Sequence, residues 1–202
     1  MSSMTGPMVE IGTLIIQTLG SLYLLVVMLR FLFQLVRADF YNPLSQFVVK
    51  ATNPLLIPLR KVVPGIYGID VASLILALIV QYIAIQLTAF VFGFGVINPI
   101  HVLMWAAVGI LSLTANIFFW GLLIMVIASW VAPQSYNPAL LLIRQLVEPV
   151  CTPFRRLIPP MGGLDISIIF AFLALNVVQI LIKYLAGMVG INSQISHLVL
   201  GI

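Results

Sequence analysis

The chain has 202 residues, of which 62% are hydrophobic and only 7% charged, with a net charge of +4. Soluble domains carry roughly a quarter charged residues, so this composition excludes an ordinary soluble protein. The basic excess does not form a cluster on a solvated domain, which argues against nucleic-acid binding and favours anionic lipid headgroups as partners. Cys151 is the only cysteine, so no intramolecular disulfide is possible, and we interpret it as a packing residue.

Four apolar stretches are each long enough to cross a bilayer as a helix, which takes about 20 residues. They cover residues 11–36, 71–92, 102–131 and 166–189. No basic residue precedes the first stretch, which argues against a cleaved signal peptide. The sequence therefore predicts an all-α membrane protein with four transmembrane helices.

The basic residues indicate an orientation. Seven of the nine lie in the connections after the first and third stretches: Arg37, Lys50, Arg60, Lys61, Arg144, Arg155 and Arg156. By the positive-inside rule these connections are cytoplasmic, which places both termini in the periplasm if the membrane is a bacterial inner membrane. Arg30, near the end of the first stretch, is expected to snorkel to the same side.

The two halves of the chain repeat each other. Residues 41–70 align without a gap with residues 136–165, and the shared residues are Tyr, Asn, Pro, Arg, Gly and Asp rather than aliphatic ones. This pattern predicts two tandem units, residues 11–93 and 102–190, each with two spans. Units of two spans are parallel repeats, related by an axis along the membrane normal.

Each repeat contains an Asn-Pro dipeptide followed by further prolines. An asparagine is a good helix cap and a proline a good first residue, whereas the residue before a later proline tends to leave the helix. We therefore predict a short amphipathic interfacial helix in each repeat, then a proline-rich segment that is either kinked at the interface or re-entrant. The cap, first residue and end are Asn42, Pro43 and Pro54 in the first repeat, and Asn137, Pro138 and Pro149 in the second.

In the first predicted helix, Leu44, Phe47, Val48 and Ala51 recur at helical spacing, and we expect them to form its apolar face.

Each proline-rich segment also carries a basic pair and is followed by an aspartate. We expect Arg60, Lys61, Arg155 and Arg156 to form one basic belt at headgroup level that binds lipid or a partner. Asp70 and Asp165 open the next spans. They either cap those helices or pair with Arg60 and Arg155, and both interpretations stay open.

The segment RADFYNPLSQFVVKATNPLLIPLRKVVPGIYGIDVASL and its second copy, YNPALLLIRQLVEPVCTPFRRLIPPMGGLD, closely resemble the YggT family, called YlmG in some bacteria and plastids. The resemblance covers essentially the whole chain and is of the two-copy proteobacterial type. It implies an inner-membrane or plastid-membrane protein without a settled activity. Members have been linked to osmotic or salt-stress tolerance, to division and nucleoid distribution, and to haem attachment in plastids. The second copy departs from the first at residues 140–142.

Polar side chains within the spans are costly in lipid. Gln81 and Asn176 occupy equivalent positions in the two repeats, and Asn176, Gln179 and Lys183 share one helical face. We interpret them as hydrogen bonds between helices, with a polar path as the alternative.

Enzyme signatures are absent from the sequence, and His101 and His197 have no carboxylate or thiolate cluster beside them. We expect no cofactor, no metal and no catalytic residue. The favoured hypothesis is a non-enzymatic assembly or scaffold factor that acts through its basic cytoplasmic surface on lipid, a membrane-protein partner or a second copy. The alternative is a small transport or osmotic-stress component with a polar path between the repeats.

Overall fold

The computed structural model of the protein describes residues 6–65, 68–131, 135–157, 167–192 and 195–202. Asp165 lies outside these ranges. The described elements are α1 (Pro7–Leu35), α2 (Pro43–Val62), α3 (Val71–Val91), α4 (Pro99–Val131), α5 (Pro138–Leu157), α6 (Ser167–Met188) and a 3₁₀ turn, η1 (Ser196–Leu198).

Four of these helices, α1, α3, α4 and α6, are long and apolar enough to span a membrane. They confirm the predicted all-α fold with four spans, and the chain is a multi-pass membrane protein. Two spans start earlier than predicted because a proline begins each, α1 at Pro7 and α4 at Pro99. The Asn98 side chain accepts a hydrogen bond from the Ile100 N–H, so Asn98-Pro99 is a third Asn-Pro helix start.

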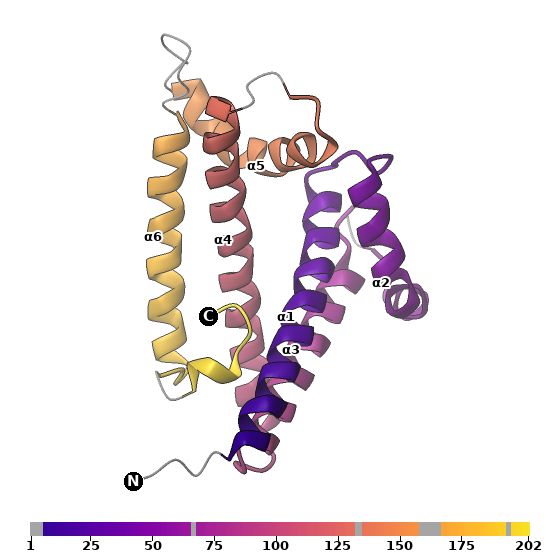
Figure 1. The fold of residues 1–202 in the computed structure, drawn as a ribbon, viewed down its shortest axis with the longest axis vertical. Helices are drawn as coiled ribbons and strands as arrows, with labels where there is room; N and C mark the ends of the chain where they lie inside the picture. The colour runs from indigo at the N-terminus through magenta and orange to yellow at the C-terminus, as the bar shows by residue number, and fades with distance from the viewer. Residues whose placement is uncertain (1–5, 66–67, 132–134, 158–166, 193–194) are drawn as a thin grey trace.

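The spans form two pairs, α1 with α3 and α4 with α6, and α3 packs against α4 to join them. Figure 1 shows α2 and α5 towards the same end of the molecule, with the start of α1 at the opposite end. We call the first of these the α2/α5 end. This arrangement agrees with two parallel repeats.

The prediction that Pro54 and Pro149 end their helices was wrong. α2 continues through Pro54 and Pro58, and α5 through Pro149 and Pro153. Each helix instead changes direction along its length (Figure 1), as expected where a proline removes a backbone donor. In α2, the buried residues Val48, Thr52 and Leu56 lie on both sides of Pro54. The packing of this continuous buried face stabilises the helix by more than the residue before proline disfavours it.

The apolar face predicted for α2 differs from the face with which α2 packs on the protein. The buried side chains are Ser45, Val48, Thr52 and Leu56, whereas Leu44 and Phe47 are exposed. Ser45 donates a hydrogen bond to the Asp39 carbonyl and Thr52 to the Val48 carbonyl, so the small polar residues point inward where acceptors are available. The large apolar residues can face outward because lipid, unlike water, carries no penalty for them.

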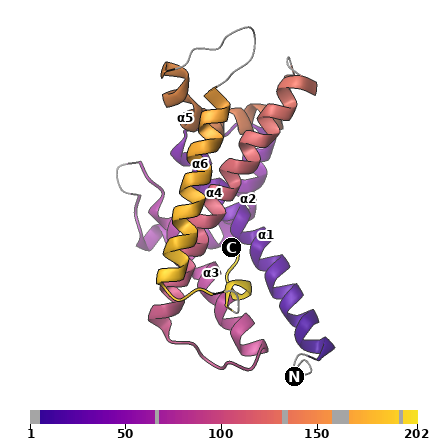
Figure 2. The same ribbon diagram turned by 90° about the vertical axis from the view of Figure 1, so that its left-hand side faces the viewer.

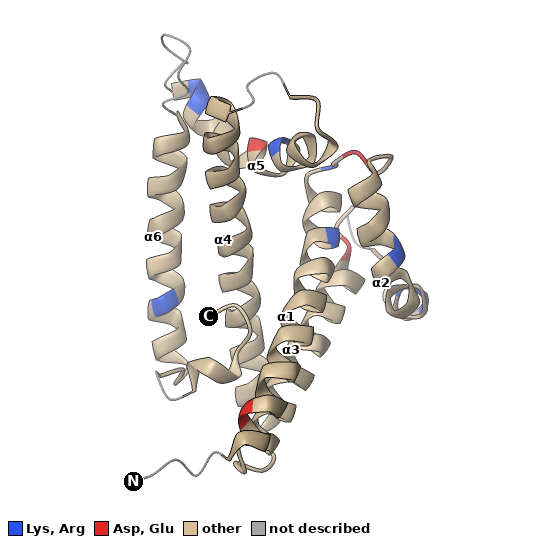
Figure 3. Ribbon diagram, in the orientation of Figure 1, with Lys and Arg blue, Asp and Glu red and all other residues tan. Residues whose placement is uncertain are grey.

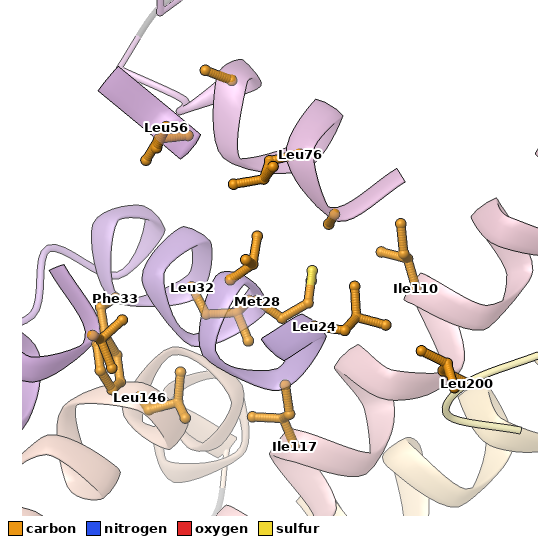
Figure 4. Close-up of a cluster of buried hydrophobic side chains, with 14 of the residues drawn as sticks. Leu24, Met28, Leu32, Phe33, Leu56, Leu76, Ile110, Ile117, Leu146 and Leu200 are labelled. Carbon is orange, nitrogen blue, oxygen red and sulfur yellow. The ribbon is translucent and has the colours of Figure 1, made fainter. Parts of the chain in front are cut away.

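One stripe of α1 is the centre of the largest core cluster. Leu24, Met28 and Leu32 recur every fourth residue and are almost fully buried. Figure 4 shows side chains from the other elements around this stripe, including Leu56, Leu76, Ile110, Ile117, Leu146 and Leu200. A helix at this position must be apolar on several sides, which explains why α1 shows no clear amphipathic pattern.

A hydrogen bond joins the two Asn-Pro motifs at the α2/α5 end. Asn42 caps α2 by accepting from the Leu44 N–H at 3.0 Å, and its Nδ2 donates to the Pro138 carbonyl at 2.7 Å. Asn137 accepts from the Ala139 N–H at 2.8 Å. Asn42 is buried and joins the repeats as well as capping α2, whereas Asn137 is exposed and, among the described residues, caps α5.

This difference predicts unequal effects of Asn→Asp substitutions, which keep the capping oxygen but remove the Nδ2 donor. Asn42→Asp should lower the free energy of unfolding by about 1–3 kcal/mol, because the bond to the Pro138 carbonyl is lost and a buried carboxylate is placed beside that carbonyl. Asn137→Asp should stay within about 0.5 kcal/mol of the original protein. Thermal unfolding in detergent measures both. Equal effects of the two substitutions would contradict the inter-repeat role of Asn42.

Candidate functional site

The candidate site is the α2/α5 end, which carries most of the charged groups. In the first repeat, the Asp70 carboxylate lies 2.5 Å from the Arg60 guanidinium. Asp70 also accepts hydrogen bonds from the Ser73 N–H and hydroxyl at the start of α3. The sequence left capping and ion pairing open as alternatives for Asp70, and the structure shows both at once.

The Asp70 side chain is almost completely buried, whereas Arg60 is 39% exposed. Burial alone raises the pKa of the Asp70 carboxyl. The hydrogen bonds from Arg60 and Ser73, together with the charge of Arg60, outweigh burial and hold this pKa below its ordinary value of 3.8. Asp70 is therefore ionised at neutral pH and fastens the end of α2 to the start of α3.

Arg30 does not snorkel to the surface as predicted. It is buried in α1 and donates to the Val49 carbonyl and the Asn53 side chain of α2, at 3.2 and 3.1 Å. A third bond, at 3.2 Å, goes to the Thr52 hydroxyl. These acceptors lie in the turn before Pro54, where the helix loses a backbone hydrogen bond. Arg30 thus supplies donors to a stretch of helix that the proline weakens.

The second repeat has apolar residues where the first has the Arg30–Thr52 contact. The positions equivalent to Arg30 and Thr52 are Met125 and Val147, 95 residues later in the sequence. Arg155, the counterpart of Arg60, forms an ion pair of 2.6 Å with Glu148 of the same helix. The predicted pairing of Arg155 with Asp165 falls outside the described residues. The repeats therefore share a backbone plan but differ at the Arg30 and Thr52 positions.

The structure does not bring the four predicted belt residues together. Arg60 and Lys61 are in the last turn of α2, and Arg155 and Arg156 are in the last turn of α5. Figure 3 shows basic residues at both of these helix ends, on opposite sides of the molecule. Within each pair the first arginine forms an ion pair, while Lys61 and Arg156 are exposed.

Polar side chains of the spans form hydrogen bonds to residues near the end of the chain, a contact that sequence reasoning missed. Residues 195–202 turn back into the bundle after α6 (Figures 1 and 2), and Leu198, Val199 and Leu200 are buried. Gln17 and Gln81 of the first repeat donate to the carbonyls of His197 and Leu200. In the second repeat, two α4 side chains, Ser112 and Asn116, donate to the Gly201 carbonyl at 2.6 and 3.1 Å.

This returning segment (residues 195–202) fits closely against α4. A Cβ on Gly109 would lie 2.6 Å from the Val199 side chain, so only glycine allows the approach. Gly201 has a positive φ of 90°, which turns its backbone beside α4. The apolar composition of VLGI gives no sign of a buried segment, but the glycines at positions 109 and 201 are a signal that could have found the contact.

The predicted polar pair Gln81 and Asn176 is not brought together. Gln81 is fully buried, whereas Asn176 is exposed and donates to the Phe172 carbonyl of its own helix. Gln179 donates to Asn116 at 3.2 Å, which joins α6 to α4. Lys183 lies beside these groups, on the wall of a 350 Å³ cavity between α4, α6 and the returning segment. Hydrogen bonds between elements therefore hold Gln179 and the Gln81 Nε2, whereas Gln81 Oε1 is buried without a partner among the described residues.

Neither histidine lies in a cluster of metal-binding side chains within the described ranges. His101 lies beside the Trp105 ring, and the His197 ring makes an edge contact with Phe92 at 4.9 Å. Cys151 is buried in a cluster with Leu122 and Val147.

The low pKa of Asp70 predicts an acid-dependent loss of stability. A depressed pKa in the folded state stabilises the protein fully above the ordinary value of 3.8, and this contribution disappears as pH falls below it. Asp70→Asn should lower the melting temperature at pH 7 and weaken its dependence on acid. The measurement is thermal unfolding between pH 7 and pH 3, with Glu10→Gln as control. An unchanged acid dependence in Asp70→Asn would show that other groups determine it.

Arg30 can be tested by giving the first repeat the residues of the second. Arg30→Met should lower the free energy of unfolding by about 1–3 kcal/mol, because buried acceptors in α2 lose their donor. Thr52→Val removes one of those acceptors. The double substitution should therefore cost less than the sum of the two single ones, by about 0.5–3 kcal/mol. Additive costs would mean that Arg30 and Thr52 are not coupled.

Comparison with known proteins agrees with the resemblance seen in the sequence. The CCB3/YggT family model matches residues 9–91 and again residues 104–186. The chain is 55% identical over 184 residues to an uncharacterized protein of Pseudomonas aeruginosa PAO1, covering 90% of this chain and 93% of that relative. It is 41% identical over 169 residues to the uncharacterized protein YggT of Escherichia coli K12, covering 83% and 86%. No solved structure matches. The chain therefore belongs to the CCB3/YggT family, whose model matches it twice.

Proposed function

We propose that this protein is a non-enzymatic membrane assembly or scaffold factor whose α2/α5 end faces the cytoplasm and binds anionic headgroups and a membrane-protein partner. The proposal depends on one observation, the position of α2 and α5 towards the same end of the molecule, where the Asn42–Pro138 hydrogen bond joins them. Two bent helices joined in this way form a surface much wider than a single loop.

The composition of this surface suits a membrane interface. Lys61 and Arg156 are exposed, and so are large apolar side chains such as Phe47, Leu55 and Ile57 of α2. Apolar side chains beside basic ones are typical of helices that lie among lipid headgroups. The cytoplasmic orientation and the periplasmic termini are supported by the seven basic residues in the two connections at this end.

A transport or osmotic-stress role is the second candidate and has less support. A conduction path needs polar groups that face an open route through the spans. Gln81 and Asn116 instead donate to carbonyls of the returning segment, and Asn176 lies on the exposed surface. The cavity beside Lys183 is the observation that favours this candidate. Ion flux through liposomes that hold the purified protein would support it over the scaffold role.

Neutralising the two exposed basic residues tests the proposed function. The double substitution Lys61→Gln and Arg156→Gln should reduce the proportion of anionic lipid that co-purifies with the protein, since each charge contributes about 1 kcal/mol near an anionic surface. It should also reduce recovery of a stoichiometric membrane partner. The melting temperature should not change, because neither side chain is in an ion pair within the described part of the chain.

The matched control is Lys183→Gln, which removes a cation from α6 within the opposite half of the span. Lipid composition is measured by mass spectrometry of protein purified from native membranes. If the Lys61 and Arg156 variant keeps both the anionic lipid and the partner, the surface serves orientation alone and the scaffold proposal fails.

A further inference from the structure

An apolar groove of about 640 Å³ separates α1 from α4, beneath the first halves of α2 and α5. Its volume is in the range of about 300–1,000 Å³ that is typical of small-molecule sites. Figure 4 shows three of its lining residues, Phe33, Ile117 and Leu146, which come from α1, α4 and α5. Phe47 and Trp120 line it too and are 62% and 60% exposed, so the groove opens to the surroundings of the spans.

The lining offers no amide, hydroxyl or charged side chain that needs a partner. Asn116 is the one residue of these kinds among the described residues that line the groove. Its amide nitrogen donates to the Gly201 carbonyl, and its oxygen accepts from Gln179. A ligand in this groove therefore makes mainly apolar contacts, which suits a hydrocarbon chain.

The length of the groove selects among apolar ligands. The lining residues of α1 run from Leu25 to Phe33, and those of α4 from Leu113 to Ile124. At 1.5 Å per residue these stretches are roughly 12 and 16 Å long. The hydrocarbon core of a bilayer is about 30 Å thick, so the groove is as deep as one leaflet. A transmembrane helix of a partner needs about twice this length.

The α2/α5 end closes the groove against a spanning helix. Asn42 donates to the Pro138 carbonyl and the Asp39 N–H donates to Gln145, and these two bonds join the repeats above the groove. A helix in the groove would collide with this connection before reaching the aqueous phase. An acyl chain ends inside the bilayer and enters from the side, so the connection does not obstruct it.

We propose that this groove binds one acyl chain of a phospholipid from the leaflet on the α2/α5 side. The lipid would fill the space between α1 and α4 and would support the first halves of α2 and α5 from below. This inference is independent of the scaffold role, because it concerns the groove and not the exposed basic residues.

Two valines of the spans provide a matched test. Val26 of α1 lines the groove and is partly buried, whereas Val177 of α6 does not line it and is 50% exposed. Val26→Phe therefore fills the groove, and Val177→Phe makes the same change in volume on an open face. Ala139→Phe fills the groove from the α5 wall.

The proteins are stripped of annular lipid by detergent, incubated with dipalmitoyl phosphatidylglycerol or phosphatidylethanolamine, and examined by native mass spectrometry. The original protein and Val177→Phe should each retain one lipid that Val26→Phe and Ala139→Phe lose. Equal retention of the two headgroups is expected, because the groove contacts the chain and not the headgroup.

The use of both walls keeps the test informative if one groove variant fails to fold. Retention of the lipid by a folded groove variant, or its loss from Val177→Phe as well, would overturn the proposal. It is also overturned if the groove variants change only the number of copies in the complex, since the groove would then be a contact between copies.

Discussion

In lipid, every backbone carbonyl must find a donor within the protein, and the irregular parts of this structure follow from that requirement. Pro54 removes the helical donor of the Lys50 carbonyl, and Arg30 donates to neighbouring acceptors of the same turn, the Val49 carbonyl and the Thr52 hydroxyl. The returning segment enters the bundle as irregular backbone apart from η1, and Gln17, Gln81 and Ser112 donate to its carbonyls. Most of the buried polar residues within the spans therefore stabilise the fold by hydrogen bonding.

The same requirement explains why duplicated halves have diverged. The first repeat uses Arg30 and the Arg60–Asp70 ion pair to fasten α2 against α1 and α3. In the second repeat Met125 and Val147 stand at the positions of Arg30 and Thr52, and Arg155 forms an ion pair with Glu148 of its own helix. Asn42 bonds across to the second repeat, while Asn137 has no equivalent bond in the described residues. The first repeat thus holds the second in place, and the symmetry of the sequence is broken where the halves meet.

These features connect the fold to its proposed roles. The α2 and α5 helices are joined by the hydrogen bond from Asn42 to the Pro138 carbonyl, and both carry exposed basic and apolar side chains. Below these helices, the repeats separate and leave an apolar space of one leaflet's depth. The opposite half is closed by the returning segment, whose buried Leu198 and Leu200 fill the seam between the spans. One leaflet therefore faces the apolar groove, whereas the other faces the part of the bundle that the returning segment fills.

The sequence by itself determined the four spans, the duplication and the Asn-Pro helix starts, because hydrophobic length and capping are local properties that a short stretch of residues decides. It did not determine whether the helices pass through Pro54 and Pro149, because packing on both sides of a proline outweighs its local preference. Only the tertiary structure decided that Arg30 is buried, that Ser45 and Thr52 face inward, and that residues 198–200 return to the core. Each of these depends on acceptors or donors that lie on another element, and a pattern within one element cannot reveal its partners.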